Sequence, residues 1–271
     1  MNNIVTRAIW GALFVAIVIS SFIVGGYATA IVLGFFMCIG LYEFYRFFSK
    51  STILKPKSSA GVMGGLTLYS GLVLHQLNII HFDLHLLFIP IIFLPFLYVV
   101  FSKAKNPLLD LTVTFFPWLY VMFPFYLMFQ IFNFTIEDQA QWTFILGLFI
   151  MVWSNDTFAY VTGRAFGKRK LFERISPNKS WEGAIGGFIF TILAACIYAY
   201  STNGDIVFWV IAAVIVSPTG VLGDLIESRF KRLVEVKDSG TILPGHGGIL
   251  DRFDAVIYAT PFFYLLLIVF F

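Results

Sequence analysis

Charge and cysteine are scarce in this sequence. Asp, Glu, Lys and Arg supply only 12% of the 271 residues, whereas 59% are hydrophobic and the mean hydropathy is +0.87. A soluble globular domain carries about 25% charged residues, so this composition excludes one. The two cysteines, Cys38 and Cys196, both lie in apolar runs and exclude a disulfide framework or a cysteine metal site. No G-x-x-x-x-G-K motif followed by Ser or Thr occurs, which excludes a P-loop.

Long apolar runs dominate instead. About 20 residues at 1.5 Å rise cross the hydrocarbon core of a bilayer, so a run of ~17–25 apolar residues predicts a transmembrane helix. We predict an all-α polytopic membrane protein with about nine transmembrane helices. Prolines 90, 95, 117 and 124 predict kinks in the fourth and fifth of them. The nine spans cover about 8–24, 27–48, 60–80, 84–101, 108–132, 142–162, 182–202, 206–224 and 252–271.

Basic residues are missing from every second segment between these spans. All 18 lysines and arginines fall on one side of the predicted membrane, and the other side holds Asp83, Glu137, Asp138 and Asp205 instead. The positive-inside rule then predicts a cytoplasmic N-terminus and, with nine spans, an external C-terminus. The apolar run after Arg7 imitates a signal peptide, but the next run follows at once, so we expect an uncleaved first helix.

Candidate chemistry is concentrated in the second half of the chain. Residues 1–135 are almost featureless apolar sequence, which we interpret as scaffold helices whose small-residue faces permit homodimer contacts. Residues 136–271 form the predicted catalytic region, with cytoplasmic loops at 163–181 and 225–251 that carry most of the charge. We therefore expect an integral protein of the cell (inner) membrane whose active site faces the cytoplasm.

Asp156 lies inside an otherwise apolar run, within the stretch "WSNDTFAYVTGRAFGKRK". It precedes Arg164 by about eight residues, which places it roughly 12 Å below the loop at 1.5 Å per residue. An ionisable group at that depth costs ~2.5–3.5 kcal/mol on insertion scales, so it is usually paired or faces a wet cavity. Asn155 adds hydrogen-bonding capacity beside it. The stretch therefore predicts a wet site, and the alternative is a polar contact between helices.

The segment "SPNKSWEG" contains a turn signal followed by a helix start. Residues 176–178 predict a turn, and Ser180 predicts the N-cap of the next helix. Backbone N–H groups at such a start, together with Lys179, suit phosphate oxygens. An ordinary loop and cap is the alternative. Gly183 and Gly187 are spaced for close helix packing rather than for catalysis.

The stretch "GDLIESRFKR" places polar residues at helical spacing. If the eighth span continues as a helix, Asp224, Glu227, Ser228 and Lys231 share one face, because they lie at i, i+3, i+4 and i+7. This pattern predicts a polar helix face at the membrane border. The alternative is a solvated face on which Glu227 pairs with Lys231.

The stretch "LPGHGGILDRFD" at 243–254 combines flexible and charged residues. Its glycines let the backbone approach a ligand closely, with His246 in their midst. Asp251 begins the last span, and Asp254 follows one turn later. Carboxylates at helix mouths, with lysines and arginines around them, match the needs of a polyphosphate–Mg²⁺ site.

The stretch "SRFKRLVEVKDSGTILPGHGGILDRFD" at 228–254 resembles the signature of phosphatidate cytidylyltransferases, also called CDP-diacylglycerol synthases. "SNDTFAYVTGRAFGKRK" and "SPNKSWEG" also resemble family segments, so the likeness covers roughly the second half of the chain. The resemblance implies that CTP and phosphatidate react to give CDP-diacylglycerol and pyrophosphate in phospholipid biosynthesis. It implies Mg²⁺ as cofactor, with room for a second cation. CTP, phosphatidate and membrane lipid are the expected partners, and nucleic acid is not.

Roles for the site residues follow as hypotheses. We expect Asp224 and Asp251 to bind the metal, and Asp156 and Asp238 are the alternative ligands. The residues expected to neutralise phosphates are Lys231, Arg232, Lys237 and Arg252. The residues expected to shape the loop or orient ligands are Asp238, His246 and Asp254. The expected substrate-binding residues are Asn155, Asp156, Asn178, Lys179, Ser180, Ser228, Gly247 and Gly248.

An ion-coupled membrane transporter is the alternative from another class. Nine spans and the intramembrane Asp156 suit a transporter. Against it, the polar residues gather at one face of the predicted membrane rather than along a path across it.

Overall fold

The computed structural model describes residues 3–51, 54–81, 85–137, 139–235, 240 and 247–271. The chain divides into two compact units, and we describe each by itself. The N-terminal unit comprises Met1–Phe129 and Val234–Asp251, and the C-terminal unit comprises Gln130–Leu233 and Arg252–Phe271. Two of the three boundaries fall inside helices, near residues 129 and 251, and the third falls where a helix ends at Leu233.

The N-terminal unit is helical, and its helices follow the apolar runs. Gly25 permits the reversal between the first two helices, because its φ of +122° is open to glycine but strained for other residues. A 3₁₀ turn containing Pro95 and a π-helical turn after Pro117 interrupt the later helices, as the prolines predicted. The helices are α1 (Asn3–Val24), α2 (Gly26–Phe48), α3 (Ser58–Gln76), α4 (His85–Phe93), α5 (Leu97–Phe101), α6 (Pro107–Pro117) and α7 (Phe123–Asn133), with the turns η1 (Leu94–Phe96) and η2 (Trp118–Met122).

Polar side chains inside the N-terminal unit bond to backbone groups of neighbouring helices. The Tyr45 hydroxyl donates to the carbonyl oxygen of Thr114 at 2.6 Å, and the Trp118 indole N–H donates to that of Gly61 at 2.7 Å. Asp110 is 3% exposed and accepts from the backbone N–H of Lys55 at 3.2 Å. The first bond joins α2 to α6, the second joins η2 to α3, and the third joins the segment between α2 and α3 to α6.

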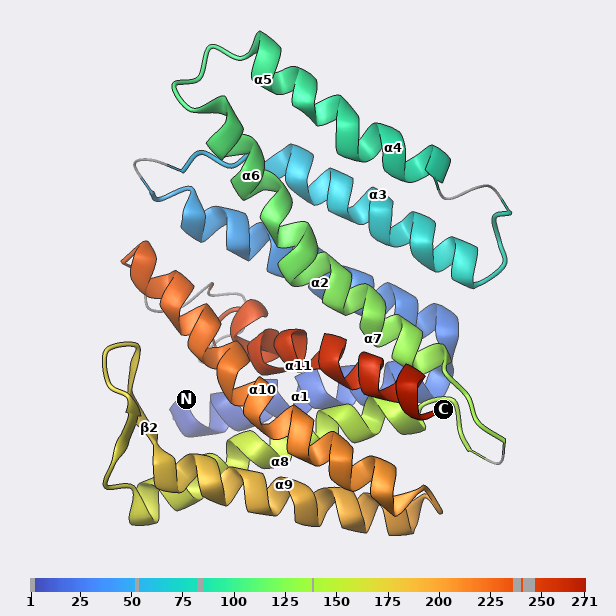
Figure 1. Ribbon diagram of the computed structural model, residues 1–271, viewed down its shortest axis with the longest axis vertical. Helices are drawn as coiled ribbons and strands as arrows, with labels where there is room; N and C mark the ends of the chain where they lie inside the picture. The colour runs from blue at the N-terminus through green and yellow to red at the C-terminus, as the bar shows by residue number, and fades with distance from the viewer. Residues whose placement is uncertain (1–2, 52–53, 82–84, 138, 236–239, 241–246) are drawn as a thin grey trace. The chain divides into compact units, whose positions relative to one another are not determined.

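The C-terminal unit consists of long helices and one hairpin, and Figure 1 shows α8 and α9 side by side. Gly183 and Gly187 make this contact close, as predicted, because an added Cβ would lie 2.7 Å from the carbonyl oxygen of Ala159 or 2.8 Å from that of Asn155. Helix α10 packs on both α8 and α9. The elements are α8 (Thr143–Phe166), β1 (Lys170–Phe172), β2 (Ser176–Ser180), α9 (Trp181–Ser201), α10 (Ile206–Leu233) and α11 (Leu250–Phe270).

The structure corrects two details of the predicted loops. The turn lies at 173–175 rather than at 176–178, since the Ile175 N–H closes on the carbonyl oxygen of Phe172 at 3.1 Å. Residues 176–180 instead form the edge strand β2, where Pro177 is tolerated although it has no N–H to donate. In addition, α10 does not end near 224 but continues to Leu233, because its polar residues pair along one face of the helix.

All nine predicted spans coincide with helices or helical runs. Among the described residues, six helical segments are long and apolar enough to cross a membrane. They are Gly26–Phe48, Pro107–Asn133, Thr143–Phe166, Trp181–Ser201, Ile206–Leu233 and Leu250–Phe270. The structure thus supports an all-α polytopic membrane protein, with one short hairpin as its β-structure in the described part of the chain.

Candidate active site

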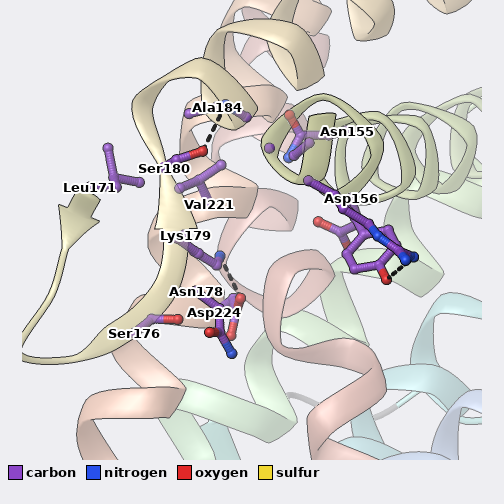
Figure 2. A pocket seen from close by; sticks show the side chains of 15 residues that line it. Asn155, Asp156, Leu171, Ser176, Asn178, Lys179, Ser180, Ala184, Val221 and Asp224 are labelled. Carbon is purple, nitrogen blue, oxygen red and sulfur yellow. Dashed lines mark hydrogen bonds and ion pairs between the residues drawn. The ribbon is translucent and has the colours of Figure 1, made fainter. Parts of the chain in front are cut away.

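A cavity of about 450 Å³ lies within the C-terminal unit (Figure 2). Helices α8, α9 and α10 and strands β1 and β2 form its wall. Its volume falls within the range of small-molecule sites, about 300–1,000 Å³. Its polar lining residues are Asn155, Asp156, Tyr160, Arg164, Ser176, Asn178, Lys179, Ser180 and Asp224.

Helix α8 contributes two polar neighbours with different surroundings. Asn155 is 1% exposed, and its Oδ1 accepts a hydrogen bond from the Ser217 hydroxyl of α10 at 2.6 Å. Its Nδ2 has no hydrogen-bond partner among the described residues. Asp156, one residue later, is exposed and lines the cavity. Asn155 therefore makes the polar contact between helices that was weighed for this stretch, whereas Asp156 faces open space.

The start of α9 is fixed by local hydrogen bonds. The Ser180 hydroxyl oxygen accepts from the Gly183 N–H at 3.1 Å, which confirms the predicted N-cap. The Glu182 carboxylate accepts from the backbone N–H groups of Lys168 at 3.0 Å and Arg169 at 3.2 Å. These bonds tie the segment after α8 to the first turn of α9, and so hold β2 at the cavity.

Lys179 of β2 reaches across the cavity wall to α10. Its ammonium group forms an ion pair with the Asp224 carboxylate, and Figure 2 shows the two side chains directed at each other. The other oxygen of Asp224 accepts from the Ser228 hydroxyl at 3.3 Å. Both groups of the ion pair are partly exposed, so a phosphate can reach the lysine and a cation can reach the carboxylate.

Asp224 also belongs to a cluster of three carboxylates. Asp224, Glu227 and Asp254 each offer an oxygen, and these oxygens lie within 4.8 Å of one another. Gly223 allows α10 and α11 to approach here, since an added Cβ would lie 3.0 Å from the Cα of Ala255. Three carboxylate oxygens are donors that suit a hard divalent cation. The cluster therefore could hold such a cation.

Glu227 differs from the solvated residue of the alternative interpretation. It does pair with Lys231, at 2.9 Å, but its side chain is fully buried. On a solvated helix face the Glu227 carboxylate would be exposed to water. Because it is buried, the Glu227–Lys231 ion pair belongs to the interior of the unit. Sequence reasoning left Glu227 out of the site because its i, i+4 lysine resembled a surface ion pair. The sequence signal that could have identified Glu227 as a site residue is its position one helical turn after Asp224.

Some of the predicted site residues lie together at the cavity, and others lie outside the described residues. Asn155, Asp156, Asn178, Lys179, Ser180 and Asp224 line the cavity. Ser228 and Lys231 lie on the face of α10 that carries Asp224, and Asp254 joins its cluster. Arg232 and Arg252 are exposed. Lys237, Asp238 and His246 lie outside the described residues.

The remaining predicted residues lie at the start of α11, where Gly247 and Gly248 precede the helix and Asp251 is its second residue. The Gly248 N–H donates to Oδ2 of Asp251 at 2.8 Å. Gly247 has a φ of +83°, and a Cβ there would lie 2.7 Å from the same oxygen. The two glycines therefore let the backbone turn closely around the Asp251 carboxylate.

Comparison with known proteins gives one family. The family model described as "Cytidylyltransferase family" matches residues 5–270 of the chain. The chain is similar to proteins named phosphatidate cytidylyltransferase from three bacteria. With the Haemophilus influenzae protein it shares 42% identity over 169 residues, 59% of this chain and 57% of the relative. With the Bacillus subtilis protein it shares 44% over 145 residues, 51% of this chain and 54% of the relative.

The third relative, from Staphylococcus saprophyticus, shares 49% identity over 127 residues, which is 46% of this chain and 49% of the relative. The matched part thus spans about half of the length of these relatives.

Proposed function

We propose, from the premise that this chain belongs to the cytidylyltransferase family, that it transfers the cytidylyl group of CTP to phosphatidate. The products would be CDP-diacylglycerol, a precursor for phospholipid biosynthesis, and pyrophosphate. The observation that carries this proposal is the cavity lined by the Lys179–Asp224 ion pair, together with the carboxylate cluster to which Asp224 belongs. A lysine for phosphates and carboxylates for a cation are the two charges that a nucleoside triphosphate requires.

The proposed reaction is an in-line displacement at the α-phosphorus of CTP. A phosphate oxygen of phosphatidate forms a bond to that phosphorus, while the bond to the bridging oxygen of the β-phosphate breaks. Pyrophosphate leaves with the electron pair. Because a phosphomonoester has its second pKa near ~6, the attacking oxygen is already deprotonated at neutral pH. The protein therefore needs no strong general base, and its task is to position the reactants and stabilise charge.

The carboxylate cluster fits a divalent cation, and we propose Mg²⁺. Asp224, Glu227 and Asp254 would hold it, and Asp251 stays a predicted ligand from the sequence. The cation would supply neutralisation of the phosphate oxygens as charge shifts to the leaving pyrophosphate. A second cation stays a prediction.

Cationic side chains would hold the phosphates. Lys179 already lies at the cavity beside Asp224, and Arg164 lines the same cavity. Asn155 offers an unbonded Nδ2 group as a donor to a ligand oxygen. We propose that Lys231, Arg232 and Arg252 add positive charge, and the roles of Lys237, Asp238 and His246 stay predictions.

The membrane arrangement belongs to the same proposal. We propose nine transmembrane spans, a cytoplasmic N-terminus and an external C-terminus. The protein would lie in the cell (inner) membrane, with its active site facing the cytoplasm. The distribution of all 18 basic residues supports this arrangement. The shorter apolar helices Ile9–Val24 and Phe88–Phe101 add two candidate spans to the six long ones, and the ninth proposed span corresponds to α3.

The division of labour between the two halves is proposed too. Residues 136–271 would carry the chemistry, and residues 1–135 would supply scaffold helices and the contacts of a homodimer. No observation in the described residues or in the comparisons favours the transport alternative.

Pyrophosphate release by the detergent-purified protein tests the function. Phosphatidate is supplied with CTP, ATP, GTP or UTP, and with Mg²⁺ or a chelator. We expect release with CTP alone, dependent on phosphatidate and abolished by chelation. Folded protein that releases no pyrophosphate with any nucleotide would refute the proposal. In the same assay, near-wild-type turnover of folded Asp251→Asn would exclude Asp251 as a metal ligand.

A further inference from the structure

Glu43 is a carboxylate buried in an apolar helix of the N-terminal unit. It is the only acidic residue among the first 82, and it lies in α2 with 0% exposure. A buried charge in such surroundings is unfavourable unless hydrogen bonds or opposite charges compensate it. The hydrogen-bond donors to the Glu43 carboxylate are therefore the evidence for its role.

One hydrogen-bond donor to this carboxylate is a backbone N–H at the start of α11. The Leu250 N–H donates to Oε2 of Glu43 at 2.9 Å. The first N–H groups of a helix have no partner within the helix, and the partial positive charge there favours an anion. Gly40, one turn earlier on α2, faces the same residue, since an added Cβ would lie 3.9 Å from Cδ1 of Leu250. Helix α2 thus fixes the first residue of α11 by both a polar and an apolar contact.

The same carboxylate touches a second point of the stretch that precedes α11. A Cβ added at Gly240 would overlap Oε1 of Glu43 and lie 2.7 Å from its Cδ. The backbone of Gly240 therefore packs directly on the carboxylate, and a larger residue would displace one or the other. One side chain of α2 holds two points, ten residues apart, of the region that resembles the family signature.

Asp251 belongs to the turn that Glu43 holds. It follows Leu250 directly, and its Oδ2 accepts from the Gly248 N–H at 2.8 Å. Gly248, Ile249 and Leu250 are all buried, so this turn is enclosed by the unit. A displacement of Leu250 would move the Asp251 carboxylate with it.

We infer that Glu43 is a positioning residue for the nucleotidyl transfer: it anchors the first turn of α11 and thereby presents Asp251. The role rests on the proposed function, in which Asp251 is a predicted metal ligand.

The test compares Glu43→Ala with Glu43→Gln, because the carboxamide oxygen can still accept from Leu250 whereas alanine cannot. For folded protein, we expect Glu43→Ala to raise the Mg²⁺ concentration for half-maximal pyrophosphate release about 10- to 100-fold, as supporting residues around metal ligands typically do. Glu43→Gln should restore it to within about threefold of the wild type. Hydrogen–deuterium exchange of the peptide 247–253 should become faster in Glu43→Ala and recover in Glu43→Gln.

Tyr42→Phe is the matched control, since Tyr42 is the neighbouring residue on α2 and is 51% exposed. It should change neither readout. Should Glu43→Ala fail to fold, Gly240→Ala keeps the carboxylate, displaces the backbone against it, and should raise the same Mg²⁺ concentration. An active wild type whose folded Glu43→Ala variant keeps normal Mg²⁺ dependence overturns this role alone. A wild type without pyrophosphate release overturns the proposed function and this role with it.

Discussion

Polar groups are arranged differently in the two units. In the N-terminal unit, Asp110 accepts hydrogen bonds from the Lys55 N–H and from the Tyr98 hydroxyl, each at 3.2 Å. In the C-terminal unit, three carboxylates lie within 4.8 Å of one another, and the buried Nδ2 of Asn155 has no partner in the described part of the chain. The first arrangement pairs one carboxylate with two donors. The second brings together three carboxylates, of which Asp224 and Glu227 are paired with lysines, and leaves one amide donor without a partner among the described residues.

We interpret this difference as one between polar groups that stabilise the fold and polar groups that would bind a ligand. A buried acceptor with its donors is satisfied and adds a modest net stability. Carboxylates that share a site repel one another unless a proton or a cation intervenes. The ion pairs of Asp224 with Lys179 and of Glu227 with Lys231 offset part of this repulsion, and a cation bound at the cluster would offset more of it.

The sharpest way to break the comparison is to substitute one aspartate from each unit. Asp224→Asn removes a charge from the cluster and from the ion pair with Lys179. We expect turnover to fall about 100- to 1000-fold, because charge stabilisation at the reacting phosphates is usually the largest catalytic contribution. Pyrophosphate release per folded molecule measures it, with phosphatidate and CTP at saturation.

Asp110→Asn is the matched control for that substitution. It keeps an oxygen that accepts from the Lys55 N–H, so we expect turnover within about twofold of the wild type and a lower thermal stability. Equal turnover in the two variants would contradict the distinction between the units.

The helices of this protein could be predicted because their signal is local. Each apolar run is long enough to decide its own structure, and the cap at Ser180 depends only on the three residues that follow it. The extension of α10 was conditional on the spacing of Asp224, Glu227 and Lys231, and the structure supplies it.

The site could be predicted only in part, because its residues meet through tertiary contacts. Asp224 and Asp254 were both named from the sequence, but their convergence depends on the close approach of α10 and α11 at Gly223. The burial of Glu227 likewise cannot be predicted from the neighbouring sequence, because a glutamate followed by a lysine at i+4 has the same sequence pattern on an exposed and on a buried helix face. The Asn155–Ser217 bond joins residues 62 positions apart, and no local pattern announces it.

A smaller effect sharpens the comparison at the α8–α9 contact. A Cβ added at Gly187 would lie 2.8 Å from the carbonyl oxygen and 2.9 Å from Oδ1 of Asn155. We expect Gly187→Ala to lower the free energy of unfolding by about 1–3 kcal/mol, as overpacking does, and to reduce turnover by displacing Asn155. Denaturant titration in mixed micelles and the pyrophosphate assay measure the two effects.

Gly220→Ala is the control for overpacking. Its Cβ would meet only the Cβ of Ala255, at 3.8 Å, which is ordinary contact. Alanine is favoured over glycine in a helix by about 0.5–1 kcal/mol, so this variant should be unchanged or slightly more stable. A Gly187→Ala protein as stable and active as Gly220→Ala would show that the α8–α9 contact tolerates a wider spacing.

The smallest expected effect belongs to the N-terminal unit, where a lost polar contact should alter stability alone. Tyr45→Phe removes the hydroxyl that donates to the carbonyl oxygen of Thr114 at 2.6 Å and keeps the ring that fills the interior. We expect the free energy of unfolding to fall by about 1 kcal/mol, the net worth of one hydrogen bond, with turnover per folded molecule unchanged. Tyr42→Phe makes the same chemical change at an exposed position and should leave both quantities as they are. A loss of turnover in folded Tyr45→Phe would mean that bonds joining the N-terminal helices also support the chemistry, as we infer for Glu43, and the contrast between the two units would then narrow.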